Sequence, residues 1–321
     1  MTFSRGATID CELLGEAWVF REARHGDPPV VRDRLRDGEA LSGVMDRWAF
    51  AAGNALIKNA LNEPALEITL GGLTLKFTKD TAFCITGALY EVYLDDKRIP
   101  CYWRINAKAG QILKLVRPLK GMYSYLCVHG GFAVEPILNS SSTNDKAGFG
   151  GFKGRFIQEN DVIKLNTSSQ LSNIGVAALP DTRIIRVVKN SEYDSFTSAS
   201  QKLFFKQRWK IETSSNRMGY RVKGEQALEL NAPLQMSSHG VDIGMIQVPP
   251  QGQPIVLMAD AQTTGGYPKI ASVIDADIGL LAQIRYGKEC QFELLTIKDA
   301  LVQRQNRQRY IARIKEYAHE N

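Results

Sequence analysis

The sequence has none of the short motifs that mark the common enzyme classes. GxSxG, HExxH and the kinase signature set are absent, which excludes the catalytic machinery that each encodes. The glycine-rich segment Gly148–Arg155 matches neither the Walker A loop nor the GxGxxG fingerprint. Tight packing between strands is its simpler interpretation, and a phosphate-binding role stays open beside it.

Cysteines are few and widely spaced. The five cysteines form no CxxC pair, which argues against a zinc knuckle and a thioredoxin-like site, and no other metal site is indicated. Cys84, Cys101 and Cys127 lie in apolar runs, so we expect buried thiols in a reducing compartment. A catalytic cysteine would need a neighbouring base, and the sequence places no histidine next to any of them.

Long apolar runs are also missing. No run approaches the ~20 residues that a membrane-spanning helix needs. Arg5, Asp10 and Glu12 interrupt any signal-peptide core. The sequence therefore predicts a cytoplasmic protein without a membrane partner.

Charge of one sign is not concentrated in this chain. The 40 basic and 34 acidic residues are interspersed and give a net charge of +6. Nucleic-acid binding requires a concentrated basic patch with stacking aromatics, so we expect no nucleic-acid partner. A small anionic molecule or an acidic protein partner suits this charge better.

The first half is predicted to be rich in strands. A helix is expected over Asp46–Asn59, followed by a hairpin of Ala65–Leu70 and Leu73–Phe77 joined at Gly71-Gly72. Further short strands are expected at Phe83–Ile85, Tyr90–Leu94, Gln111–Leu115 and Tyr123–Val128. Strands at this spacing are typical of an antiparallel barrel or sandwich. Polar stretches after residue 139 place a domain boundary near 175, giving domains 1–175 and 176–321.

The second half is predicted to resume with strands and to end in a helix. Strands are expected at Arg183–Val188, Ile255–Met258 and Gln291–Leu295, and a helix at Asp194–Phe205. In the last helix, Thr296 and Asp299 fit a capping box. Its apolar stripe comprises Leu301, Val302, Tyr310, Ile311, Ile314 and Tyr317. The basic residues off this stripe, which form a solvated face or contact an acidic partner, are Arg304, Arg307, Arg309, Arg313 and Lys315.

Two short polar segments of the second half carry candidate chemistry. Ser214–Tyr220 places Arg217, whose planar fork suits a carboxylate or phosphate, beside hydroxyl and amide groups. A turn in which Ser and Asn satisfy the backbone is the equally weighted alternative. In Ser237–Gly240, His239 fits a general acid or base, or a structural hydrogen-bonding residue in a turn.

The richest polar segment runs from Gln247 to Lys269. A short apolar strand leads into a loop with a carboxylate, an amide, two hydroxyls and two glycines. Gly265-Gly266 permits close approach of a ligand or an anion-binding nest. Asp260 is suited to orienting an amide N–H or holding Mg²⁺, and Lys269 to balancing an anion.

Several stretches closely resemble the C-subunit family of bacterial 5-oxoprolinase, within the biotin-dependent carboxyltransferase (allophanate hydrolase subunit 2) family. They are SSNRMGYR at Ser214–Arg221, SHG at Ser238–Gly240 and QPIVLMADAQTTGGYPKIA at Gln253–Ala271. The matches SGVMDRWA at Ser42–Ala49 and SSSTNDKAGFGGFKGR at Ser140–Arg155 support it. The family's usual Gln-Asp-x-Gly-Arg segment is missing here, where Val31–Gly38 reads VRDRLRDG. Residues 1–41 are therefore atypical for the family.

The resemblance implies a mainly β protein of two cyclophilin-like β-barrel subdomains with a few helices and a C-terminal helix. It implies a cytoplasmic heteromer with the B subunit of 5-oxoprolinase, and functionally with its A subunit, that opens 5-oxo-L-proline to L-glutamate. ATP with Mg is implied in the complex, with no cofactor covalently bound to this chain. One alternative is the carboxyltransferase component of a biotin-dependent urea or amide carboxylase, with biotin on a separate partner because Met-Lys is absent. The other is a non-enzymatic regulator that antagonises a kinase inhibitor.

The resemblance and the polar segments together nominate three sets of site residues. The catalytic candidates are Arg217, His239 and Asp260. The candidates for substrate binding are Ser215, Asn216, Tyr220, Gln247, Gln262, Thr263, Thr264, Gly265, Gly266, Tyr267 and Lys269. The candidates from the first half are Ser141, Thr143, Gly151, Lys153 and Arg155. We expect Arg217, His239 and the Thr263–Gly266 backbone to stabilise charge on an amide oxygen.

Overall fold

The computed structural model describes residues 7–12, 18–21, 43–137, 139–145 and 147–321. By their internal contacts these residues form two units. Unit 1 holds the described residues up to 21, then Asp46–Leu179 and Gln308–Asn321, and unit 2 holds residues 43–45 and Pro180–Arg307. The departure from the family over Val31–Gly38 lies outside the described residues.

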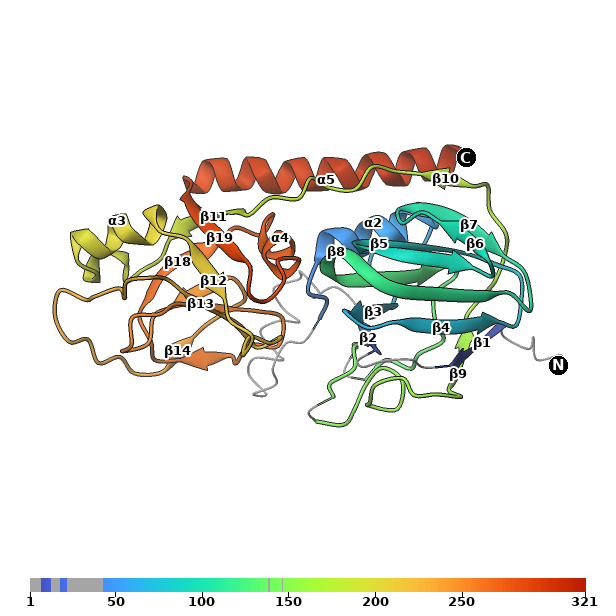
Figure 1. Ribbon diagram of the computed structural model, residues 1–321, viewed down its shortest axis with the longest axis horizontal. Helices are drawn as coiled ribbons and strands as arrows, with labels where there is room; N and C mark the ends of the chain where they lie inside the picture. The colour runs from blue at the N-terminus through green and yellow to red at the C-terminus, as the bar shows by residue number, and fades with distance from the viewer. Residues whose placement is uncertain (1–6, 13–17, 22–42, 138, 146) are drawn as a thin grey trace. The chain divides into compact units, whose positions relative to one another are not determined.

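Unit 1 is built on one ten-stranded sheet (Figure 1). Its main path runs β10-β7-β5-β8-β4-β1-β9, with β2, β3 and β6 attached to it. The strands are β1 (Ala7–Glu12), β2 (Trp18–Arg21), β3 (Ala65–Thr69), β4 (Leu73–Phe77), β5 (Thr81–Leu94), β6 (Lys97–Ile99), β7 (Trp103–Ala107), β8 (Ile112–Val128), β9 (Val162–Leu165) and β10 (Ile174–Gly175).

Two long strands organise this sheet. The four short strands predicted between Phe83 and Val128 are in fact β5 and β8, which pair along their length through register shifts. The predicted hairpin is wrong, because β3 and β4 both pair with β8, at Leu66↔Leu126 and Leu75↔Leu113. A 17-residue strand is long enough to accept two partners in succession. Gly71-Gly72 therefore joins consecutive partners of one strand rather than two strands of a hairpin.

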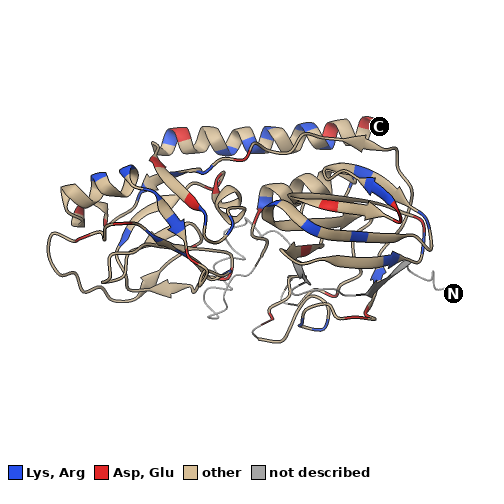
Figure 2. Ribbon diagram, in the orientation of Figure 1, with Lys and Arg blue, Asp and Glu red and all other residues tan. Residues whose placement is uncertain are grey.

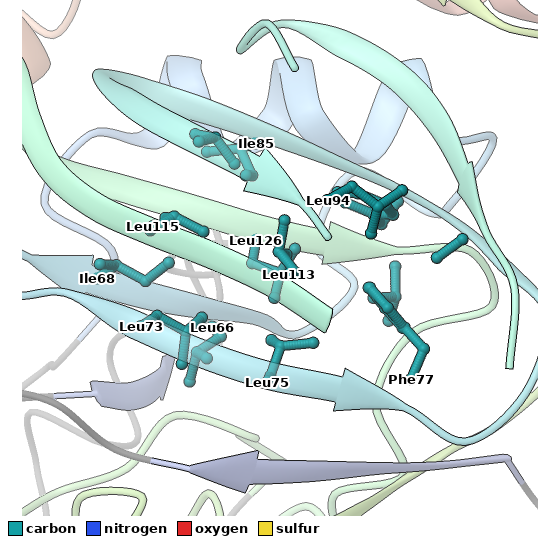
Figure 3. Packing of buried hydrophobic residues seen from close by; sticks show 14 of the residues in the cluster. Leu66, Ile68, Leu73, Leu75, Phe77, Ile85, Leu94, Leu113, Leu115 and Leu126 are labelled. Atoms are coloured by element: carbon teal, nitrogen blue, oxygen red, sulfur yellow. The ribbon is translucent and has the colours of Figure 1, made fainter. Parts of the chain in front are cut away.

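Alternation along these strands makes the core of unit 1. In β4, Leu73, Leu75 and Phe77 are buried, and Leu113 and Leu115 of β8 face the same cluster (Figure 3). Since side chains alternate between the faces of a strand, this pattern fixes the register.

The predicted first helix is confirmed as α2 (Arg47–Leu56), which packs on β5 and β8. Asp46 caps it, since its Oδ1 accepts from the amide of Ala49 at 3.1 Å. Cys84 and Cys127 are fully buried, which confirms the expectation for these two thiols, whereas Cys101 is only partly buried. Burial, first of all, raises the pKa of the Cys84 thiol well above its usual value, which disfavours the reactive thiolate.

A fully buried arginine ties the two ends of unit 1 together. Arg104 donates to the carbonyls of Leu56 and Ala318 at 3.2 Å each. It also donates to the carbonyl and hydroxyl oxygens of Ser172 at 2.7 Å each. Leu56 and Ala318 lie in the last turns of α2 and α5 (Ile297–Glu320), where helix carbonyls lack partners and the dipole favours a cation.

Unit 2 contains a closed barrel in the order β11-β18-β15-β16-β13-β12-β19, and its parallel β11–β19 pair completes the circuit. A separate two-stranded ribbon consists of β14 and β17. The strands are β11 (Ile184–Lys189), β12 (Trp209–Ile211), β13 (Gly219–Lys223), β14 (His239–Gly240), β15 (Met245–Gln247), β16 (Ile255–Leu257), β17 (Thr264–Gly265), β18 (Lys269–Val273) and β19 (Glu289–Leu294). The helices are η1 (Tyr193–Ser195), α3 (Ser198–Lys206) and α4 (Ile278–Ala282).

The mainly β fold is thus confirmed, with one closed barrel and one curled sheet. The strands predicted in the second half are present as β11, β16 and β19, and the helix predicted at Asp194–Phe205 is divided into η1 and α3. Among the described residues no helix is long and apolar enough to cross a membrane.

The C-terminal helix begins as predicted. The Thr296 hydroxyl accepts from the amide of Asp299 at 3.1 Å and donates to its carboxylate at 2.7 Å. Its apolar stripe is buried only toward the end, at Ile311 and Ile314, whereas Leu301 is 53% exposed.

Lys and Arg recur along α5 (Figure 2). Two of them bind unit 2 itself: Arg304 lies 3.8 Å from the Asp275 carboxylate, and Arg307 donates to the Ala276 carbonyl at 3.2 Å. Arg304 is nevertheless half exposed, as expected for a solvated face, whereas Arg307 is partly buried by its contact with Ala276.

We predict that Arg104→Met lowers the free energy of unfolding by about 3 kcal/mol, because it leaves buried carbonyls without donors. Arg117→Met is the matched control. Arg117 is 71% exposed and pairs with Glu91, and such surface pairs contribute about 0–1 kcal/mol. Urea denaturation measures both, and equal losses would contradict the role assigned to Arg104.

Candidate functional site

Two buried polar residues lie opposite each other on neighbouring strands of the barrel in unit 2. Gln247, at the end of β15, is the direct partner of Lys269, at the start of β18, beside a register shift after Ile246. Residues directly opposite each other in a ladder project to the same face of the sheet. Both side chains are buried, with residue exposures of 2% and 4%. The barrel therefore brings an amide and an ammonium together in a site with little water.

The ammonium of Lys269 has a carboxylate partner that the sequence analysis missed. Glu192, just after β11, lies 3.0 Å from Lys269 Nζ and also accepts from the Lys269 backbone amide at 3.0 Å. Burial disfavours the charged form of Glu192, but hydrogen bonds from Ser191 and Lys269 outweigh it and lower its pKa. Glu192 is therefore ionised at neutral pH and balances the charge of Lys269.

His239 closes the other side of Lys269. Its Nδ1 lies 3.0 Å from the carbonyl of Ser237, and its Nε2 contacts Lys269 Nζ. A carbonyl only accepts, so we assign the proton to Nδ1 and leave the Nε2 lone pair to accept from the ammonium. Both ring nitrogens are thus engaged, and His239 has no lone pair left to act as a base in this state.

Gly265 lies against the amide of Gln247. A Cβ at position 265 would stand 2.5 Å from Gln247 Nε2, so only glycine permits this approach. Neither Gly265 nor Gly266 is among the described residues with positive φ, so this pair does not form the alternating nest considered from the sequence. Its role is to let the ribbon lie close over Gln247.

The predicted anion-binding fork of Arg217 is closed by a protein carboxylate. Arg217 Nε and Nη2 donate to the two Asp260 oxygens at 2.8 and 3.0 Å, and Nη2 also contacts the carbonyl of Gly43. The backbone amide of Asp260 donates to the Arg217 carbonyl at 2.8 Å. The pair therefore fixes the Ser214–Tyr220 turn against the loop after β16.

The other residues of that turn have structural contacts. The Ser215 hydroxyl exchanges hydrogen bonds with the backbone of Arg221, and the Asn216 side chain accepts from the Met218 amide at 2.8 Å. Tyr220 is fully buried and donates to the Ala282 carbonyl at 3.0 Å. The turn alternative considered from the sequence accounts for Ser215 and Asn216, whereas Tyr220 belongs to β13 and bonds to α4.

The rest of the Gln262–Tyr267 loop lies around the buried pair. Gln262 Nε2 donates to Gln247 Oε1 at 3.4 Å, and the Thr263 carbonyl accepts from Val241. Thr264 is exposed, and Tyr267 is 45% exposed. Gly266, Tyr267 and Pro268 form one wall of a pocket of about 700 Å³. Its other walls are Leu228, Glu229, Leu230, Pro233, Leu234, Gln235, Met236, Val248, Pro249 and Pro250.

The candidates from the first half lie in unit 1. Arg155 pairs with both oxygens of Asp161, at 2.6 and 2.7 Å, and this hydrogen bonding is the main cause that lowers the pKa of Asp161. Lys153 lies 3.9 Å from the same carboxylate. Gly151 has φ 54°, and a Cβ there would collide with Thr143 Oγ1. Ser141 is buried. These contacts hold the loop's own shape.

Comparison with known proteins identifies the chain's relatives. The family described as carboxyltransferase domain, subdomain A and B, matches residues 38–294. The chain belongs to this family. It is 49% identical over 281 residues to the 5-oxoprolinase C subunit of Haemophilus influenzae, covering 87% of this chain and 91% of that protein. It is 43% identical to the 5-oxoprolinase C subunit of Escherichia coli, covering 92% and 97%.

Some larger relatives contain a region that is similar to this chain. The urea amidolyase of Saccharomyces cerevisiae is 26% identical over 83% of this chain, which spans 16% of that protein. The solved structure of urea amidolyase from K. lactis superposes with a TM-score of 0.86 at 25% identity, over 98% of this chain and 20% of that one. The fold and family expected from the resemblance are thus confirmed.

In this family member, Glu192 and the walls formed by residues 228–236 are the site features absent from the sequence prediction. Glu192 lies in the turn Asn190-Ser191-Glu192, which carries no motif. A buried lysine needs an acidic partner, so Lys269 was itself a signal that such a residue exists. Glu192 could be found only once β11 was known to pair with β18.

We predict that Glu192→Gln costs about 3 kcal/mol of unfolding free energy at pH 7, because it leaves the buried Lys269 charge uncompensated. The folded pKa of Glu192 lies below its usual 4.5, so its stabilisation is complete above pH 4.5 and is lost as pH falls through the folded value. The difference from the wild type should therefore shrink in acid. Glu225→Gln, at an exposed position, is the control, and a pH-independent difference would contradict the assignment.

Proposed function

We propose that this chain is the C subunit of an ATP-dependent 5-oxoprolinase, which opens 5-oxo-L-proline to L-glutamate together with its A and B subunits. The observation that carries the proposal is the identity of 49% and 43%, over almost the whole length, to proteins of that name. Identity to the S. cerevisiae urea amidolyase is 26%. The chain is expected to act only in the complex.

The site of unit 2 supports a reaction at a small amide. Opening a lactam adds water across the ring C–N bond, and negative charge develops on the carbonyl oxygen. Lys269 offers a buried, charge-balanced ammonium at 3.0 Å from Glu192. Fixed donors in a site shielded from water are the arrangement that stabilises such charge. We assign Arg217 and Asp260 a positioning role, because their side chains form an ion pair with each other.

ATP would supply the activation of the lactam oxygen by phosphorylation. In the described part of the chain no three His, Cys, Asp or Glu side chains are placed to hold a metal ion. The carboxylate of Asp260, considered for Mg²⁺ from the sequence, is paired with Arg217. These residues do not fit a Mg–ATP site, so we propose that the other subunits bind the nucleotide.

A second candidate is the carboxyltransferase component of a biotin-dependent carboxylase. It is favoured by the superposition on the urea carboxylase of Kluyveromyces lactis, with a TM-score of 0.86 over 99% of this chain and 30% of that one. In that case the same amide site would meet urea instead of 5-oxo-L-proline.

We predict that the chain, purified with the A and B subunits of its own organism, forms L-glutamate from 5-oxo-L-proline only when ATP is present. Omitting this chain should abolish the activity. Bicarbonate uptake into urea with a biotin carrier would instead support the carboxylase. A stable complex with a kinase inhibitor and neither activity would make the chain a regulator.

A further inference from the structure

In the β14–β17 ribbon, one residue contacts Lys269 and its cross-strand partner lies against Gln247. In the ribbon, His239 is the direct partner of Gly265. In the barrel, Gln247 is the direct partner of Lys269. His239 contacts Lys269 Nζ, and Gly265 lies against Gln247 Nε2. Each ribbon residue therefore shields one barrel donor.

Two hydrogen-bond donors beneath the ribbon lack an acceptor within the described part of the chain. Gln247 Nε2 is buried without a partner there. The ammonium of Lys269 has three N–H groups, and the described contacts engage two of them, at Glu192 and His239. Buried donors are nearly always paired in folded proteins, so a cluster of unpaired ones points to a missing ligand.

The charge of the site favours a neutral acceptor. Glu192 is ionised, so the pair that it forms with Lys269 has no net charge. A carboxylate ligand would bring an uncompensated negative charge into a buried site, which is costly. A carbonyl oxygen brings none, and it can accept from an amide and an ammonium at once.

We propose that Gln247 Nε2 and Lys269 Nζ form an oxygen-binding subsite for the carbonyl of a small amide, covered by the β14–β17 ribbon. The carbonyl replaces His239 as an acceptor of Lys269 and supplies the acceptor that Gln247 lacks. Gly240 is the last residue of β14, and Gly265 is the last residue of β17 and is followed by Gly266, so both strands end in a flexible residue that permits this movement. The identity of the amide as a lactam rests on the proposed function.

Binding of small probes to the isolated chain tests the subsite without any activity. In 15N-histidine-labelled protein, 2-pyrrolidinone should shift the Nε2 signal of His239, because the ring loses its bond to Lys269. Urea should act in the same way, and acetate should not. His239→Gln identifies the signal among the four histidines. No response to 2-pyrrolidinone, or a response to acetate alone, would overturn the proposal.

Substitution of Gln247 tests the donor itself. Gln247→Met keeps the length of the side chain and removes Nε2, so the probe response should disappear while the unfolding midpoint is not lowered. In the reconstituted complex, kcat should fall on the order of 100-fold, the usual effect of losing one donor to a developing oxyanion. Gln251→Met, at an exposed position outside the site, should leave probe response and kcat unchanged.

A second variant guards against a folding defect. Gly265→Ala adds a methyl 2.5 Å from Gln247 Nε2, so the amide must turn away and the probe response should weaken. An unchanged response in both Gln247→Met and Gly265→Ala would refute the assignment. If the complex shows no 5-oxoprolinase activity but the probes bind through Gln247, the proposed function fails and the subsite stands. If the complex has 5-oxoprolinase activity and this activity is insensitive to Gln247→Met, the subsite fails and the proposed function stands.

Discussion

The ammonium of Lys269 is the constraint on which the site of unit 2 depends. A charge that is almost fully removed from water needs a partner of opposite sign, and Glu192 supplies it at 3.0 Å. Glu192 reaches this place because β11 and β18 are neighbours in the barrel. His239 then accepts from the same ammonium, which draws the ribbon over the strand ends. The glycine at 265 lets the ribbon lie close to Gln247 beside this pair.

Unit 1 contains a second buried cation that is handled differently. The Arg104 guanidinium donates hydrogen bonds to the carbonyls of Leu56, Ala318 and Ser172 and to the Ser172 hydroxyl. No carboxylate is needed, because two of these carbonyls belong to the C-terminal ends of helices. Arg104 therefore has a structural role, whereas Lys269 has a third N–H group that the described contacts leave for a ligand. This difference in hydrogen bonding separates a residue that holds the fold from one that is suited to a ligand.

Local signals were sufficient where the structure depends on neighbouring residues, as in the α2 periodicity and the Thr296 cap. The hairpin predicted at Gly71-Gly72 is wrong because both strands pair with β8, which follows much later in the chain, at Leu66↔Leu126 and Leu75↔Leu113. A turn signal shows that a strand ends, but not which strand it pairs with. The sequence nominated Gln247, Lys269 and His239 but neither their arrangement nor Glu192, since the β15–β18 and β14–β17 registers follow from no local pattern. Arg217 and Asp260, each considered alone, suggested ligand contacts, although together they satisfy each other.

An oxygen subsite of this kind recognises what amides share and not what distinguishes them. The urea amidolyase of K. lactis shares the fold of this chain, so the proposed subsite would leave discrimination to contacts with the rest of the substrate. A lactam ring carries methylene groups that urea lacks, and these gain from apolar surroundings. The pocket walled by Val248, Pro249 and Pro268 adjoins Gly266, next to the ribbon residue that covers Gln247. Under the proposed function, apolar surface there would favour a ring over urea, while the buried donors would treat both carbonyls alike.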